Sequence, residues 1–219
     1  MAGRLLDTAL ARFSDGVGTF YDTADDGEAL IYRPADPIDG PTPSGTFAMA
    51  GALLGYGALT GSARHREAAL AALGVLGPIA PQHPRAAGAG LAVAEAVVAG
   101  PAEIAVVGPP GDPRTAALHT TALLAAPPGA VIALGDGAAG GEGGGAAVGA
   151  DDGAAVGASD GAGAAGPGPE EAVPLLAGRG LVAGAPAAYV CRNFTCRMPV
   201  TDPMDLRAAL EYPAPAPAG

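Results

Sequence analysis

The chain has 219 residues, a formal net charge of −11 at pH 7 and 11 basic residues, all of them arginine. Its cations are scattered singly, whereas a nucleic acid or an anionic membrane surface requires clustered cations. The 36 glycines and 22 prolines interrupt every apolar run that could span a membrane. Two cysteines in this length fit a reducing cytoplasm, so we expect a cytoplasmic protein without nucleic-acid or membrane partners.

Apolar spacing predicts helices through the first hundred residues, separated by one long loop. The predicted helices run over Arg4–Phe13, from the N-cap Ser44 to Thr60, from the N-cap Ser62 to Leu76, and over Arg85–Val98. Short Gly/Pro turns between the later helices favour an antiparallel helical array.

The second half changes character. Strands are predicted over Glu103–Val107 and Ala130–Leu134 with a helix over Thr115–Ala125 between them, which makes a small βαβ unit. Residues 137–169 are almost entirely Gly, Ala, Asp and Pro, a composition typical of disorder. A strand over Ala187–Cys196 and a helix over Asp202–Leu210 follow.

The loop from Phe20 to Gly45, here called the acidic loop, concentrates the charged residues that could do chemistry. Hydrolysis of a glycosidic bond needs two carboxyl groups, about 5–5.5 Å apart for retention or about 6.5–9.5 Å for inversion. Asp22 with Asp25 or Asp26 could form such a pair. In the alternative interpretation these aspartates accept backbone N–H bonds in turns, and Arg33 is an ion-pair partner that holds the loop closed.

Cys191 and Cys196 have a C-x4-C spacing. In a continuous strand their Cα atoms would lie about 16 Å apart, while a disulfide permits about 4.4–6.8 Å. The strand prediction therefore favours free, buried or half-buried thiols, unless a sharp turn at Arg192–Asn193 brings the two residues together.

No metal site or cofactor is predicted. His65, His83 and His119 lie on separate elements without paired-ligand spacing, so each is expected at a surface or a helix end. The segment Gly108–Asp112 lacks the Lys-Ser/Thr ending of a phosphate-binding loop.

Three stretches together resemble one family: GTFYDTADDGEALIYRPADPIDGPTPSG (18–45), EIAVVG (103–108) and AYVCRNFTCRMPVTDP (188–203). They are similar to the C-terminal portion of bacterial thioredoxin-domain-containing proteins related to spermatogenesis-associated protein 20. In that family a thioredoxin-like domain precedes an α/α toroid that resembles six-hairpin glycosidases and N-acylglucosamine 2-epimerases.

The resemblance implies a mainly α fold, namely the last helical hairpins of an incomplete α/α toroid with a small βαβ/β appendage. The implied divisions are toroid hairpins with a pocket-rim loop (1–101), a βαβ unit (102–136), a disordered insertion (137–170), a C-terminal strand and helix (171–212) and a tail (213–219). Asp22, Arg33, Asp39 and the turn at Ser44 would border the toroid's pocket. Ala35 and Thr46 depart from the family pattern, which has Lys and Asn there.

The sequence contains no Cys-x-x-Cys, so the redox module of the family is missing from it. We therefore expect a C-terminal unit that is not catalytic alone, with a carbohydrate-type pocket in the complete protein. One alternative is a glycosidase- or epimerase-like enzyme with catalytic Asp22, Asp25 and Asp26 and substrate-binding Arg33, Asp39 and Ser44. The other is a non-catalytic scaffold that binds an upstream thioredoxin-like module.

Overall fold

The structure of the chain is a computed structural model, and it describes residues 1–137 and 173–211. The predicted insertion (137–170, apart from Gly137) and the predicted tail (213–219) lie outside these residues. None of the helices within the described ranges is long and apolar enough to cross a bilayer.

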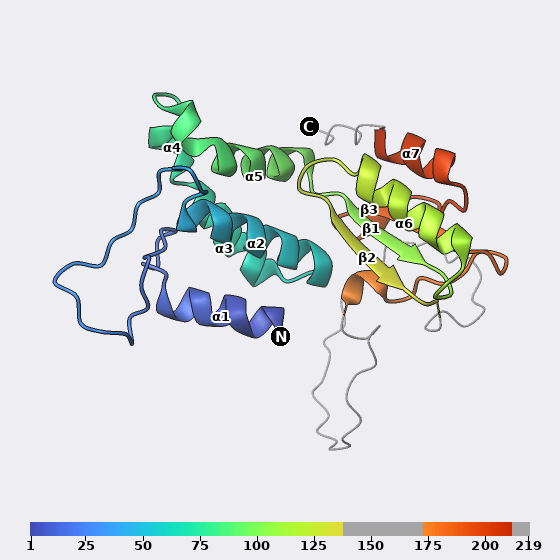
Figure 1. Cartoon of the computed structure of the whole chain (residues 1–219), viewed down its shortest axis with the longest axis horizontal. Helices are drawn as coiled ribbons and strands as arrows, with labels where there is room; N and C mark the ends of the chain where they lie inside the picture. Colours follow the sequence, from blue (N-terminus) through green and yellow to red (C-terminus); the bar gives the residue numbers. More distant parts are fainter. Residues whose placement is uncertain (138–172, 212–219) are drawn as a thin grey trace, which may run out of the picture.

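One side of the molecule consists of helices that pack around α2 (Figure 1). They are α1 (Ala2–Arg12), α2 (Gly45–Thr60), α3 (Ala63–Leu73), α4 (Leu76–Ile79) and α5 (Gly88–Ala99), with the 3-10 turn η1 (Pro84–Ala87) before α5. Helix α2 begins where predicted, because the Ser44 hydroxyl accepts the N–H of Phe47 (3.2 Å). It ends at Gly61, whose φ of +74° only glycine adopts easily. Phe47 and Leu53 are buried on it and anchor it in the core.

The other side is a four-stranded sheet in the order β2-β1-β3-β4. Its elements are β1 (Glu103–Val107), α6 (Pro113–Ala125), β2 (Val131–Gly135), the 3-10 turn η2 (Pro174–Leu176), β3 (Ala187–Arg192), β4 (Thr195–Cys196) and α7 (Pro203–Glu211). Strands β1 and β2 are parallel and joined through α6, which confirms the predicted βαβ unit. Strand β3 pairs with β1 antiparallel.

The two faces of the sheet bury different partners. Ile104 and Val106 pack with Leu118 of α6 and Leu206 of α7 on one face. On the opposite face, Ala105 and Val107 pack with η2, and Leu59 of α2 also contacts this cluster. Because α2 reaches this second face, the helical layer and the sheet share a boundary there.

The prediction of a mainly α chain is wrong. Of the described residues, 47% are helical and 13% are extended, so the fold is mixed α/β. The C-terminal segment is not an appendage, because β3 inserts next to β1 and places β1 in the middle of the sheet. Short strands far apart in sequence pair only through long-range contacts, which apolar periodicity does not reveal.

The single strand predicted over Ala187–Cys196 is also wrong, because it is a hairpin. Asn193 and Phe194 both have positive φ, 49° and 60°, as a two-residue type I′ turn requires. Asn tolerates this conformation, whereas it is unfavourable for Phe. The Phe194 ring packs close to Gly61 at the end of α2, so tertiary contact helps to stabilise the turn.

Candidate functional site

The acidic loop lies at the end of the helical layer remote from the sheet (Figure 1). Asp25 and Asp26 both turn toward Arg12 of α1. Asp25 Oδ1 accepts from Arg12 Nη1 at 3.2 Å, and Asp26 Oδ2 lies 3.4 Å from Arg12 Nε. About half of each carboxylate side chain is exposed (47% and 55%). Solvent therefore screens these pairs strongly.

Arg33 holds the loop, but not as the predicted ion-pair partner of its carboxylates. Its Nη2 donates to the carbonyl oxygens of Arg12 (3.0 Å) and Thr23 (2.5 Å). Its guanidinium also stacks 4.1 Å from the centre of the Tyr21 ring. Through these contacts Arg33 links the loop segment from Tyr21 to Thr23 to Arg12, the last residue of α1.

Asp39 and Ser44 fasten the end of the loop to two helices. Asp39 Oδ1 accepts the N–H of Ser44 (2.9 Å), and Oδ2 accepts the N–H of Ala89 at the start of α5 (2.8 Å). Ser44 is buried and caps α2. Asp22 is exposed, and its backbone N–H donates to Pro34 O (2.9 Å). The loop therefore uses most of its predicted site residues for its own architecture, and their role toward a sugar stays a prediction.

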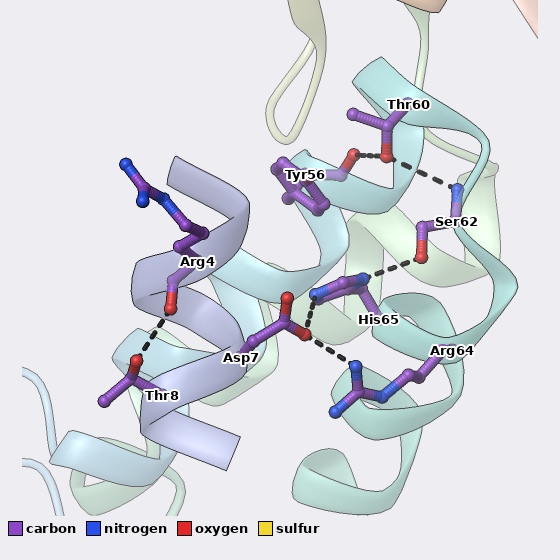
Figure 2. A network of polar contacts seen from close by, with 8 residues as sticks. All are labelled: Arg4, Asp7, Thr8, Tyr56, Thr60, Ser62, Arg64 and His65. Atoms are coloured by element: carbon purple, nitrogen blue, oxygen red, sulfur yellow. Dashed lines mark hydrogen bonds and ion pairs between the residues drawn. The ribbon is translucent and has the colours of Figure 1, made fainter. Parts of the chain in front are cut away.

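A Ser–His–Asp arrangement joins α1 to α3 (Figure 2). Ser62 Oγ lies 2.7 Å from His65 Nδ1, and His65 Nε2 lies 3.4 Å from Asp7 Oδ1 without hydrogen-bond geometry. Asp7 binds Arg64 more closely, at 2.6 Å. Ser62 and His65 occupy the N-cap and N3 positions of α3, where the serine hydroxyl bonds the imidazole and not a backbone N–H. His65 is 6% exposed, so it stands at a helix end as predicted but not at the surface. We assign the network a structural role.

A cavity of about 380 Å³ lies where β1 and β2 end, beside the start of α6. Ligands of α/β sheets bind at such edges. Here Asp112 caps α6 by accepting the Arg114 N–H (2.8 Å), and Gly108 N–H donates to Gly135 O. The carboxylate already occupies the N-terminus of the helix, so the cavity does not favour an anion. The buried Thr115 hydroxyl lining it has no hydrogen-bond partner among the described residues.

The prediction of free thiols is wrong, because Cys191 and Cys196 form a disulfide. They are register partners that face each other across the β3–β4 hairpin. Residues one step beyond a two-residue turn form a non-hydrogen-bonded pair, in which the side chains approach most closely. The turn, which a continuous strand would not contain, therefore brings the two cysteines close enough to bond.

Glu103, Cys191 and Cys196 make a row across β1, β3 and β4, here called the disulfide row. Glu103 is the register partner of Cys191, and Cys191 is the register partner of Cys196. Side chains directly opposite in antiparallel strands share a face, with Cβ atoms about 4.5–5.5 Å apart. Cys191 is 1% exposed, while Cys196 is an exposed residue on the edge strand.

Arg179, which follows η2, lies against both sulfur atoms. Its Nη2 is 3.0 Å from Cys196 Sγ and 3.4 Å from Cys191 Sγ. Its Nη1 donates to the carbonyl oxygens of Leu175 and Ala177. Burial lowers the pKa of Arg179, and Glu103 opposes that effect. Tyr189 fixes the same segment by donating its hydroxyl hydrogen to Gly180 O (2.8 Å).

Glu103 is a buried acid, with 3% of its surface exposed. Its Oε2 accepts the N–H of Phe194 in the hairpin turn at 2.7 Å. Burial raises the pKa of Glu103, although this hydrogen bond and the charges of Arg179 and Arg66 act in the opposite direction. A small cavity of about 70 Å³ is lined by Glu103, by Asn193 and Phe194 of the turn, and by residues of α2 and α3.

Spacing along the sequence does not reveal Glu103 and Arg179 as site residues. The C-x4-C spacing around an Asn was a usable signal, since it fits two cysteines that flank a two-residue turn. In the sequence, Glu103 is an ordinary member of a β-rich run.

Within residues 1–137 and 173–211, no group of three or more His, Cys, Asp or Glu side chains is placed to hold a metal.

Comparisons of the chain with protein-family models, with curated proteins and with solved structures found no match.

Proposed function

We propose that the chain takes part in thiol–disulfide exchange, with Cys191–Cys196 as its reactive pair and a dithiol protein as its reductant. The observation that carries the proposal is the guanidinium of Arg179 against both sulfurs of a bond with one buried and one exposed cysteine.

A purely structural role accounts poorly for this arrangement. The bond closes a loop with a sequence separation of 5, for which the chain-entropy model gives about 2 kcal/mol, against about 4.7 kcal/mol for a 100-residue loop. Placing a half-buried cation beside neutral sulfur costs desolvation energy. The same cation stabilises a thiolate, which is the reactive form of cysteine.

Each step of the exchange breaks one sulfur–sulfur bond and forms another. A thiolate of the partner attacks Sγ of Cys196, the Cys191–Cys196 bond breaks, and Cys191 leaves as a thiolate. The second partner thiolate then attacks the partner sulfur of the mixed disulfide and releases Cys196. The partner dithiol is oxidised to a disulfide and the chain is reduced to a dithiol, so two electrons and two protons pass.

A thioredoxin-like module, which the family resemblance implies as a partner, belongs to the dithiol class that this reaction requires. We also propose the cytoplasm as the compartment. In that reducing environment a disulfide is characteristically transient and catalytic or redox-sensing.

The test uses a thioredoxin whose second active-site cysteine is replaced by serine, so that a mixed disulfide persists. The oxidised full chain is incubated with it, the reaction is stopped with acid, and the thiol that Cys191 has released is then capped with a maleimide. Peptide mapping is expected to find the partner on Cys196 and the alkyl group on Cys191, and the Cys196→Ser variant should form no such adduct with thioredoxin. A mixed disulfide at Cys191, or a bond that opens only after denaturation in urea, would overturn the proposal.

A further inference from the structure

We infer that Glu103 moves the proton of this exchange: it protonates the Cys191 thiolate as the disulfide opens and removes that proton as the disulfide closes. The inference rests on the proposed exchange function and deepens it, because it adds an acid–base group to the reactive pair.

The sheet register places the two groups together. Glu103 on β1 stands directly opposite Cys191 on β3, on the face of the sheet that also receives Arg179. The Phe194 N–H bond to Oε2 holds the carboxyl against the hairpin that carries the sulfurs. Cys191 is the leaving sulfur when an outside thiolate attacks the exposed Cys196, and at 1% exposure it has little access to water as a proton source.

The surroundings of Glu103 favour a carboxyl that can hold a proton. Arg66 of α3 and Arg179 face it, together with the N–H groups of the hairpin turn, and all of these favour the carboxylate. Burial outweighs them, so the pKa of Glu103 lies above that of an ordinary glutamate. The raised pKa of Glu103 favours a carboxyl that holds a proton beside the newly formed Cys191 thiolate.

One proton passes between Glu103 and Cys191 in each direction of the exchange. In the opening direction, the Cys191 thiolate becomes a thiol and Glu103 becomes a carboxylate, which the guanidiniums of Arg179 and Arg66 then stabilise. Glu103 regains its proton from solvent or from the second partner thiol, which loses a proton as it becomes the thiolate that attacks the mixed disulfide. In the closing direction, the carboxylate deprotonates the Cys191 thiol, and the resulting thiolate attacks the mixed disulfide at Cys196.

In a purely structural alternative, Glu103 serves only to accept the Phe194 N–H and stabilise the hairpin turn. Glu103→Gln separates the two roles, since the amide oxygen can still accept the Phe194 N–H while the side chain carries no exchangeable acid proton. Glu67→Gln is the matched control, because it makes the same change at an exposed position of α3. Glu103→Asp keeps a carboxyl and tests whether acidity, and not shape alone, matters.

The experiment measures the rate at which reduced thioredoxin opens the disulfide in each oxidised full-length variant as a function of pH, after circular dichroism has confirmed folding. Glu103→Gln is expected to slow opening by about 100-fold, the usual contribution of a general acid, and to remove one ionisation from the pH profile. Glu67→Gln should match the unmodified chain, and Glu103→Asp should keep the ionisation.

A second readout follows Cys191 alkylation in the reduced chain. Removing the neighbouring carboxylate should lower the pKa of the Cys191 thiol in Glu103→Gln, because a like charge disfavours the thiolate. If the unmodified chain exchanges and Glu103→Gln keeps its rate, pH profile and thiol pKa, the role of Glu103 is refuted while the exchange function stands. If the unmodified chain does not exchange, the proposed function itself fails.

Discussion

The acidic loop and the disulfide row use polar side chains in opposite ways. The loop has many carboxylates, but its contacts go to backbone N–H groups and to Arg12 at the surface. The row has one buried carboxyl, Glu103, and the half-buried guanidinium of Arg179 lies against its sulfurs, beside a bond that can break. The density of charged residues in a sequence is thus a poor guide to reactivity. A buried polar or charged side chain that contributes little to the stability of the fold is a better guide to reactivity.

The largest expected effect tests the structural use of the loop. Asp39→Ala removes the acceptor of two backbone N–H groups, at Ser44 and Ala89, and should lower the free energy of unfolding by about 2–4 kcal/mol in urea titrations. Asp22→Ala, at an exposed position, should change it by less than about 0.5 kcal/mol. Equal losses in the two variants would contradict this division of the loop. A glycan screen with Asp22→Ala would test the predicted sugar site at the same time.

The next largest effect is the contribution of the disulfide to the stability of the fold. Replacing both Cys191 and Cys196 by Ala should lower the free energy of unfolding by about 2 kcal/mol, because the closed loop is short. Reduced unmodified chain should match the double variant in urea titrations. An unchanged unfolding midpoint on reduction would mean that the bond is not closed in the native chain.

A smaller effect is the pH dependence of stability. The pKa of Glu103 is raised in the folded chain, so the folded state holds this proton at pH values where the unfolded state has lost it. The contribution of Glu103 is full below its ordinary pKa and is lost as pH rises through the raised value, by at most about 1.4 kcal/mol per pH unit. The difference between unfolding curves of the unmodified chain and Glu103→Gln isolates it. A difference that grows in favour of the unmodified chain as pH rises would contradict the sign.

The smallest effect belongs to the surface pairs of the loop. Arg12→Ala breaks the contacts with Asp25 and Asp26, yet should cost less than about 1 kcal/mol because both partners are half exposed. The difference from the unmodified chain should shrink in high salt, which screens exposed charges. A larger loss that is insensitive to salt would show that the loop is more rigid than these contacts indicate.

Local signals made part of the fold predictable. Ser44 and Gly61 mark the ends of α2, and the apolar run Glu103–Val107 coincides with β1. The hairpin was not predictable in the same way, because Phe194 adopts a left-handed conformation that its residue type disfavours. Of the candidate site, the acidic loop was located but the disulfide row was not. Glu103 meets Phe194 across a separation of 91 residues, which periodicity in a short window cannot detect.

The two cysteines are neighbours along the chain, but the groups that surround them are not. A hairpin closes in about 1–10 μs, long before distant strands pair. Cys191 and Cys196 can therefore be oxidised in an unfolded or newly made chain, as an ordinary peptide disulfide would be. Arg179 and Glu103 reach the sulfurs only when the sheet assembles. The same covalent bond is therefore an ordinary peptide disulfide in the unfolded chain, and folding places it beside Arg179 and Glu103.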